Sequence, residues 1–172
     1  MKRKEYLILD GYNVINSWPK LKKLMEGNLE ESRKELIEMM AEYQAFKGVK
    51  VIVVFDAYLV KGSMESKEDI KNVEVVFTKE RETADSYIEK FITGVSKRDR
   101  VVVATNDWAE QQMILGGGAT RISVRELIIE FDRIKNKITK KTETLDQEKN
   151  MLSNRIDGSI LEKLEKFRRN PS

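Results

Sequence analysis

The chain has 172 residues with 40% hydrophobic side chains, and 32 Lys/Arg stand against 29 Asp/Glu, which suits one domain with a real core and excludes a wholly disordered chain. It contains no cysteine and no histidine, so disulfides, thiolate metal sites, cysteine nucleophiles, histidine bases and histidine-ligated zinc are excluded. Any catalysis must therefore use carboxylates, lysines, hydroxyls or a metal ion with oxygen ligands, such as magnesium, manganese or calcium.

The first part of the chain alternates apolar runs with a helical pattern. Residues 6–10 (YLILD) predict a strand, and a loop is expected over 11–19. Asn28 is suited to cap a helix whose apolar residues recur at helical spacing, and Gly48 is suited to end it. Residues 49–55 are rich in valine and predict the next strand.

The same alternation continues to the end of the chain. Residues 61–72 are polar and predict a mobile loop. The elements expected after it are, in order, a strand at 73–77, a helix capped by Thr83, a strand at 100–105, a helix at 108–115, a glycine connection at 116–118, a strand at 119–122, a helix from the Ser123–Glu126 capping box to about Ile138, and a charged helical tail with a second capping box at 159–162. Valine-rich strands between amphipathic helices predict a parallel sheet covered on both faces, with ligands at the carboxyl ends of its strands.

The C-terminal extension is basic. Residues 133–172 carry 11 Lys/Arg against 6 Asp/Glu, whereas residues 1–132 carry 21 against 23. A solvated basic helix explains this charge by itself, and a polyanionic partner is the alternative interpretation.

The N-terminus resembles the basic start of a signal peptide only superficially. The apolar run behind Lys4 is interrupted by Asp10, and no apolar stretch is long enough to cross a bilayer. We therefore expect a soluble, cytoplasmic protein with no membrane partner.

Three aspartates lie at or just past the carboxyl ends of predicted strands: Asp10, Asp56 and Asp107. Asp85 lies in the first turn of the helix after Thr83, at the same edge of the sheet. One acid at a strand end is usually a loop residue or a helix cap. Four at one edge repel one another unless some are protonated or a cation lies among them. The set therefore predicts a Mg²⁺ or Mn²⁺ site, which suits phosphodiester cleavage without a protein nucleophile.

Four motifs in this order resemble the NYN domain, a branch of the PIN-like nuclease superfamily: Asp10–Ile15, Val53–Ala57, Glu82–Asp85 and Thr105–Gln111. Within that group the chain is similar to the YacP-like family of ribosome-associated A-site endoribonucleases. The resemblance implies an α/β fold, a PIN-like three-layer α/β/α sandwich with a mostly parallel central sheet over residues 1–135, followed by a basic helical extension over 136–172. It also implies metal-dependent cleavage of single-stranded RNA, specifically mRNA in the translating ribosome, with no DNA substrate.

Carried over by position, the resemblance makes Asp10, Asp56, Asp85 and Asp107 the catalytic acids. Asp10, Asp85 and Asp107 would be the ligands of Mg²⁺ or Mn²⁺. Asn13 would orient a ligand or a water through its amide, and an Asx turn within its own loop is the alternative.

Six residues are candidates for RNA contacts: Lys79, Arg81, Trp18, Tyr58, Arg168 and Arg169. The cations would bind phosphates, although a solvated loop or tail explains them as well. Of the two aromatic residues, either is suited to stack an unpaired base, and Trp18 is equally suited to pack its loop onto the body.

Several neighbouring residues have structural interpretations that we expect to hold. Glu82 and Glu110 are expected to face solvent. The alternatives are that Glu82 is a fifth acid of the site, and that Glu110, one helical turn past Asp107, reaches the metal shell. Trp108 is expected in the core, and Asn106 as a cap of the helix that follows it. Gly11 either lets the backbone approach a ligand or only makes a turn.

The main hypothesis is a metal-dependent endoribonuclease. The alternative is a non-catalytic RNA- or ribosome-binding module, for which binding should survive chelation and depend on the tail. A phosphatase or nucleotidase is disfavoured because the segment Asp10–Tyr12 lacks the second acid, two residues on, that aspartyl-phosphate phosphatases use.

Overall fold

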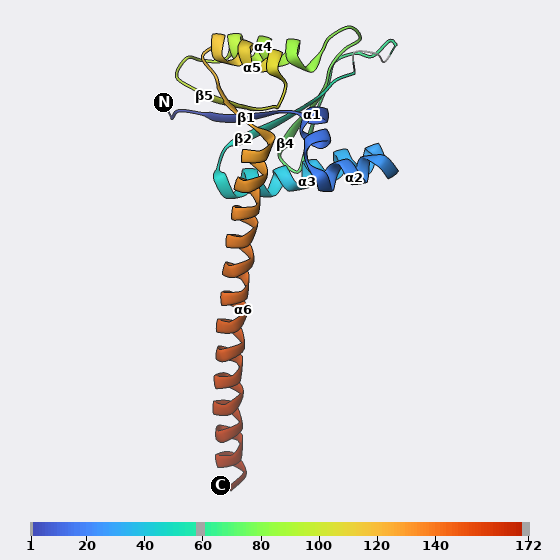
Figure 1. Ribbon diagram of the computed structural model, residues 1–172. Helices are drawn as coiled ribbons and strands as arrows, with labels where there is room; N and C mark the ends of the chain where they lie inside the picture. Colours follow the sequence, from blue (N-terminus) through green and yellow to red (C-terminus); the bar gives the residue numbers. More distant parts are fainter. Residues whose placement is uncertain (1, 58–60, 170–172) are drawn as a thin grey trace. The chain divides into compact units, whose positions relative to one another are not determined.

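The computed structural model of the chain describes residues 2–57 and 61–169. Its elements are β1 (Glu5–Asp10), α1 (Gly11–Ser17), α2 (Pro19–Gly27), α3 (Leu29–Lys47), β2 (Lys50–Phe55), β3 (Ser66–Ile70), β4 (Val73–Phe77), α4 (Ala84–Gly94), β5 (Arg100–Ala104), α5 (Trp108–Gly116), β6 (Thr120–Ile122) and α6 (Val124–Arg169). Helices α4 and α5 lie on one face of the sheet, and α1, α2 and α3 lie on the other (Figure 1). This is the three-layer α/β/α sandwich expected from the sequence.

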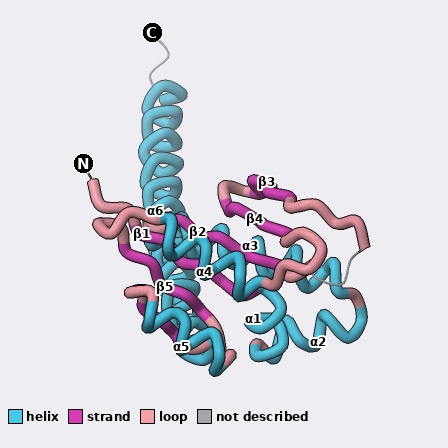
Figure 2. Tube along the Cα trace, turned by 90° about the horizontal axis from the view of Figure 1, so that it is seen from above, coloured by secondary structure: helices cyan, strands magenta, loops and turns pink. Residues whose placement is uncertain are grey.

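Within residues 2–57 and 61–169, the sheet has six strands in the order β3-β4-β2-β1-β5-β6. Neighbouring strands are parallel except for the pair β3–β4, which is antiparallel and forms one edge (Figure 2). Strand β1 lies between β2 and β5, so the carboxyl ends of these three strands meet at one edge. Ile8, Ile52 and Val103 of these strands form one buried cluster with Ile88 of α4 and Ile114 of α5. The two helices that follow β4 and β5 are thereby fixed over the centre of the sheet.

The helix caps predicted from local sequence are confirmed. The Asn28 side chain accepts from the backbone N–H groups of Glu30 at 3.0 Å and Glu31 at 3.3 Å. Gly48 ends the helix with a left-handed φ of 69°. Thr83 accepts from the N–H of Ser86, and Ser123 from the N–H of Glu126, each at 3.1 Å. Each cap satisfies N–H groups that the first turn leaves free, so it can be found from neighbouring residues alone.

Three predicted elements are wrong. The expected loop over 11–19 forms helix α1 and the start of α2, where Pro19 occupies the first turn. The expected mobile loop at 61–72 contains strand β3, whose exposed residues pair with β4 through the backbone and therefore need no apolar period. Helix α6 continues through Ile138 and through the second capping box at 159–162, so neither marks a helix boundary.

Gly11 allows α1 to pack closely on the sheet. A Cβ at this position would lie 2.5 Å from Cδ1 and Cε1 of Phe55 and 3.0 Å from the carbonyl oxygen of Val54. Phe55 cannot move aside easily, because it is fully buried between the rings of Tyr12 and Phe77, whose centroids lie 5.1 and 5.4 Å away. The glycine therefore serves helix packing, a role that neither sequence interpretation proposed.

Gly11→Ala is expected to destabilise the fold by about 1–3 kcal/mol, because the added methyl group must displace a buried ring or the β2 backbone. Urea unfolding of the full chain measures this. Gly27→Ala is the matched control, since a Cβ there would have no neighbour within 4 Å, and its stability should change little. Equal stability of the two variants would contradict this account of Gly11.

The chain divides into two compact units, Met1–Phe131 and Asp132–Ser172. The first holds the sheet and its helices, and the second is the remainder of α6 with the end of the chain. The domain boundary expected after residue 135 falls within the same helix and stays a prediction. Among the described residues, none of the helices combines the length and the apolar character needed to span a bilayer.

Candidate active site

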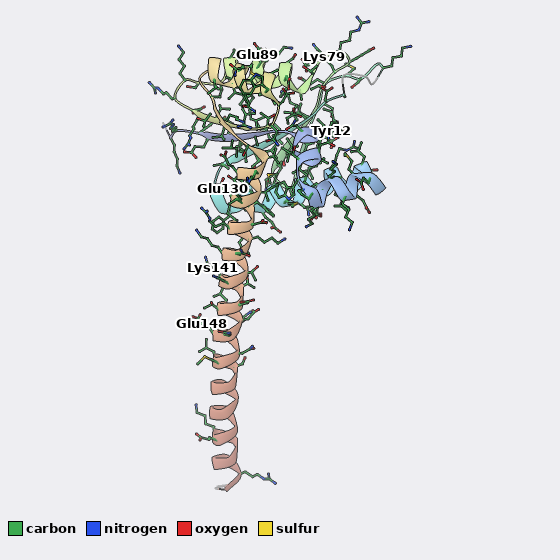
Figure 3. All side chains as sticks on the ribbon, viewed as in Figure 1. Tyr12, Lys79, Glu89, Glu130, Lys141 and Glu148 are labelled. Atoms are coloured by element: carbon green, nitrogen blue, oxygen red, sulfur yellow. The ribbon has the colours of Figure 1, made fainter. Side chains whose placement is uncertain are left out.

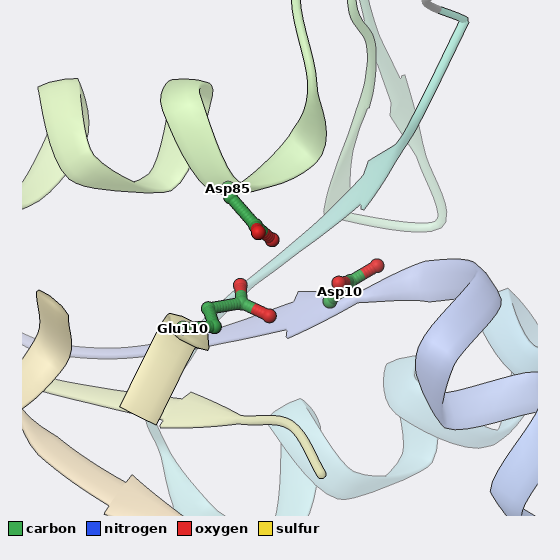
Figure 4. A group of neighbouring side chains, drawn as sticks. All are labelled: Asp10, Asp85 and Glu110. Carbon is green, nitrogen blue, oxygen red and sulfur yellow. The ribbon is translucent and has the colours of Figure 1, made fainter. Parts of the chain in front are cut away.

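Three carboxylates from distant parts of the chain converge at the carboxyl edge of the sheet. Asp10 ends β1, Asp85 lies in the first turn of α4, and Glu110 lies in the first turn of α5. One oxygen of each lies within 4.8 Å of the others, and Figure 4 shows the three side chains pointing toward one another. The sheet topology makes this possible, because β1 and β5 are parallel neighbours and α4 and α5 cover the same face.

Glu110 is the member that sequence analysis misjudged. It was expected to face solvent, but only 1% of its surface is exposed. Its Oε2 accepts a hydrogen bond from the Thr105 hydroxyl at 2.7 Å, whereas its buried Oε1 has no hydrogen-bond partner among the described residues. A signal was present in the sequence, because Glu110 is the one charged residue between positions 108 and 118. A single acid in an apolar helix is better explained by a buried polar site than by solvent.

Burial and mutual repulsion disfavour the charged forms of these acids. Loss of solvent raises the pKa of Asp10 to about 6; the charges of Asp85 and Asp107 add to this, while the neighbouring Glu110 side chain and the Asn13 backbone oppose it. Burial, and then the charge of Asp10, raises the pKa of Glu110 to about 9. Burial also raises the pKa of Asp85. Without a cation, the cluster therefore holds at least one proton at neutral pH.

The cluster has the character of a divalent-cation site. In the part of the chain that the structure describes, no ion pair joins a lysine or arginine to Asp10, Asp85 or Glu110. Buried carboxylates that repel one another are stabilised when a cation lies between them. The unpartnered Oε1 of Glu110 offers such an ion a ligand atom, and three carboxylates are the donor set that Mg²⁺ and Mn²⁺ favour. The residues therefore fit a divalent metal ion.

Asp107 lies near this cluster but has a second task. Its Oδ1 accepts from the N–H groups of Ala109 at 2.9 Å and Glu110 at 3.4 Å, which caps α5. Its charge still contributes to the raised pKa of Asp10 and Asp85. Glu110 thus occupies the third place that the sequence assigned to Asp107, whose role as a direct metal ligand stays a prediction.

Asp56 supports the start of α4 beside the cluster. Its Oδ2 accepts from the N–H of Ala84 at 3.4 Å, and its charge contributes to the raised pKa of Asp85. These contacts tie the end of β2 to the helix that carries Asp85. A catalytic role for Asp56 itself stays a prediction.

Asn13 and Asn106 link the loops around the site. Oδ1 of Asn13 accepts from the backbone N–H of Asn106 at 2.8 Å and lies 3.4 Å from the hydroxyl oxygen of Thr105. The side-chain oxygen of Asn13 therefore does not form the Asx turn that the sequence offered as an alternative. Asn106 was expected to cap α5 but does not. Its side chain accepts instead from the N–H of Val124 at 3.1 Å. The two amides join α1, the loop after β5 and the start of α6.

The aromatic residues differ from expectation. Trp18 is only 5% exposed and packs edge-on against Phe131 at 5.5 Å, so base stacking by Trp18 is wrong and packing onto the body is confirmed. Tyr58 lies outside the described residues. Trp108, expected in the core, is 72% exposed. Local apolar character did not show which of the two indoles is buried.

The charged residues singled out in the sequence differ in burial and in contacts. Lys79 and Arg81 are exposed in the loop before α4, and Figure 3 labels Lys79 there. Glu82, expected at the surface, is 5% exposed and binds Lys90 through its Oε2 at 2.7 Å. In α6, Arg168 is exposed and Arg169 is the last helical residue. RNA contacts by these cations stay predictions.

Comparison with known proteins gives one consistent result. The profile of the YacP-like NYN domain matches residues 7–169, which includes the extension and goes well beyond the expected 1–135. The chain is 45% identical over 166 residues to a Bacillus subtilis (strain 168) protein named "Uncharacterized protein YacP", covering 96% of this chain and 97% of that protein.

Two crystal structures, both of Rae1 (YacP) from Bacillus subtilis, have the same fold. One is 42% identical with a TM-score of 0.72 and covers 99% of this chain and 97% of that one. The other, of a point mutant, is 43% identical with a TM-score of 0.71 and covers 81% and 82%. The chain therefore belongs to the YacP-like NYN family, whose domain is of the nuclease type.

Proposed function

We propose that this protein is a divalent-metal-dependent endoribonuclease that cleaves single-stranded RNA, with mRNA in the translating ribosome as its substrate. The observation that carries the proposal is the convergence of Asp10, Asp85 and Glu110 at the carboxyl edge of the sheet in a nuclease-type domain. These three residues would hold Mg²⁺ or Mn²⁺. When bound, such an ion lowers the pKa of a water and neutralises charge on a phosphoryl oxygen.

The protein's own groups prepare the site. Thr105 fixes the Glu110 carboxylate through Oε2, which leaves Oε1 available as a buried ligand atom. Asp56 and Asp107 hold the first turns of α4 and α5, and therefore hold Asp85 and Glu110. Because the chain contains no histidine or cysteine, the attacking group would be a water rather than an imidazole or a thiolate.

Substrate binding would rest on exposed cations of the body and of the C-terminal extension. Lys79 and Arg81 are exposed next to α4 and are suited to bind the RNA backbone. The basic extension, with 11 Lys/Arg against 6 Asp/Glu, supports a large polyanionic partner such as a ribosome–mRNA complex.

The direct test is a reconstituted translation reaction with a defined mRNA, in which new 5′ ends are mapped with and without the full-length protein. New ends that depend on the added protein, and on translation of the message, are the expected result. A folded, metal-loaded protein that produces no new ends on translated or free mRNA would contradict the proposal.

The alternative module that binds RNA or ribosomes without cleaving rests on the basic extension. It predicts that Arg168→Gln/Arg169→Gln abolishes ribosome co-sedimentation and that the protein yields no new ends. An endoribonuclease instead yields ends that disappear when the acidic cluster is changed. Turnover of small phosphomonoesters would favour the phosphatase interpretation.

A further inference from the structure

Helix α5 exposes two large apolar side chains, Trp108 and Leu115, on the side that faces solvent, together with the polar Gln112. Between positions 108 and 118 its one charged residue, Glu110, is buried. Trp108 is 72% exposed and Leu115 is 68% exposed, although Ile114 of the same helix is fully buried. An exposed tryptophan in particular leaves a large, rigid aromatic surface in water.

Trp108 is placed beside the acidic cluster. It is the first residue of α5 and directly follows Asp107, which caps the helix through the N–H groups of Ala109 and Glu110. Helical side chains lean toward the N-terminus of their helix, so the indole leans toward the carboxyl edge of the sheet. Trp108 and Glu110 are two residues apart, which places them about 200° apart around the helix. The indole therefore lies on the other side of α5 from the Glu110 carboxylate, outside the acidic cluster. It stays close to the cluster along the chain, because the neighbouring Asp107 contributes its charge to Asp10 and Asp85, and this exposed N-terminal surface of α5 is the rim of the cluster.

The chemistry of this rim suits a nucleobase. The exposed residues beside Trp108 on α5, among them Ala109 and Gln112, carry no positive charge that would bind a phosphate. An indole face stacks on any unpaired base and is tolerant of sequence. A base that is paired in a duplex has its faces covered by its neighbours and is not available to a flat partner of this kind.

Resting on the proposed function, we propose that Trp108 stacks on an unpaired base of the RNA substrate next to the phosphodiester that is cleaved, and that this contact favours single-stranded over paired RNA. Trp108 is then a specificity-determining residue that binds substrate without touching the reacting atoms. Its loss should weaken substrate binding and leave the chemical step intact.

Three full-length variants test this. Trp108→Ala should raise KM for RNA about 5- to 100-fold, the loss expected for one stacked base, with kcat within about twofold of wild type. Trp108→Phe should restore most of the affinity, because it keeps an aromatic face. Leu115→Ala is the matched control: it removes a similarly exposed apolar side chain from the same helix, about 10 Å further along its axis, and should change neither constant.

Fluorescence gives a readout that does not depend on cleavage. The chain has two tryptophans, and Trp18 is buried, so titration with a short single-stranded RNA should quench the exposed indole of Trp108 while Trp18 reports that the fold is intact. The same strand annealed to its complement should quench it much less. Trp108→Phe should lose the RNA-dependent quenching and keep the Trp18 emission.

Three other outcomes would each overturn the stacking role of Trp108. If wild type cleaves and Trp108→Ala cleaves with the same KM, the stacking role is overturned while the proposed function stands. If Leu115→Ala weakens RNA cleavage as much as Trp108→Ala, the face of α5 docks a protein surface or a second copy of the chain instead of a base. If wild type neither binds nor cleaves RNA in any context, the proposed function and the stacking role both fail.

Discussion

The double variant Asp10→Asn/Asp85→Asn is expected to lower RNA cleavage by roughly a thousandfold or more, because two neutral amides bind a divalent cation much more weakly and do not offset its charge. Both substitutions keep the size and shape of the side chain, so the body should remain folded. The measurement is the rate at which new 5′ ends appear on a translated mRNA. Asp69→Asn is the control, because Asp69 is an exposed aspartate on β3 at the edge of the sheet.

The same double variant is expected to be more stable than the metal-free wild type, by about 1 kcal/mol. Burial and the charge of Asp85 raise the pKa of Asp10, which shows that the ionised cluster is unfavourable in the fold. Urea unfolding in the presence of a chelator measures the difference. A folded double variant that cleaves as fast as wild type would remove these acids from the catalytic site.

Much of the fold was readable from the sequence because its signals are local. The valine-rich strands exclude most alternative fold classes. The helix caps at Asn28, Thr83 and Ser123 depend only on residues two or three positions away. The edge at which Asp10 and Asp85 meet follows from the parallel topology alone. The sequence pattern and the family resemblance therefore agree on the architecture and on where the acids gather.

The wrong predictions concern elements whose structure and burial are determined by tertiary contacts. Helix α1 is seven residues long, too short to be stable alone, and forms because Val14 and Ile15 are buried against the body. In α5, large apolar residues occur both on the buried side and on the exposed side, so periodicity does not tell which side faces the core. That is why Glu110 was assigned to solvent and Trp108 to the core, the reverse of what the structure shows. Glu110 is a buried acid that belongs to the site, and Trp108 is an exposed indole at its rim.

Glu110→Gln is expected to change the pH dependence of stability in the metal-free protein. The pKa of Glu110 rises from an ordinary 4.5 to about 9 on folding, so between these values the folded chain holds a proton that the unfolded chain has lost. Its contribution to stability is full below about pH 4.5 and declines as the pH rises toward 9. Asp10, whose pKa rises from 3.8 to about 6, adds a similar decline that is complete earlier.

Metal-free wild type should therefore lose at least about 4 kcal/mol of stability between pH 5 and pH 8, whereas Glu110→Gln, which cannot ionise, should lose clearly less. Urea unfolding at several pH values in chelator measures both, with the exposed Glu89→Gln on α4 as the control. Wild type that gains stability over this range would show that Glu110 is not protonated in the fold.

Adding Mn²⁺ should reverse the trend for wild type, because an ion that replaces the shared protons binds more tightly as the pH rises. Glu110→Gln should respond less to Mn²⁺ and should cleave RNA roughly a hundredfold more slowly, since the neutral amide is a poorer ligand than the carboxylate it replaces. The two effects must appear together if one buried oxygen is responsible for both. A variant that keeps full cleavage and the full response to Mn²⁺ would return the third ligand position to Asp107.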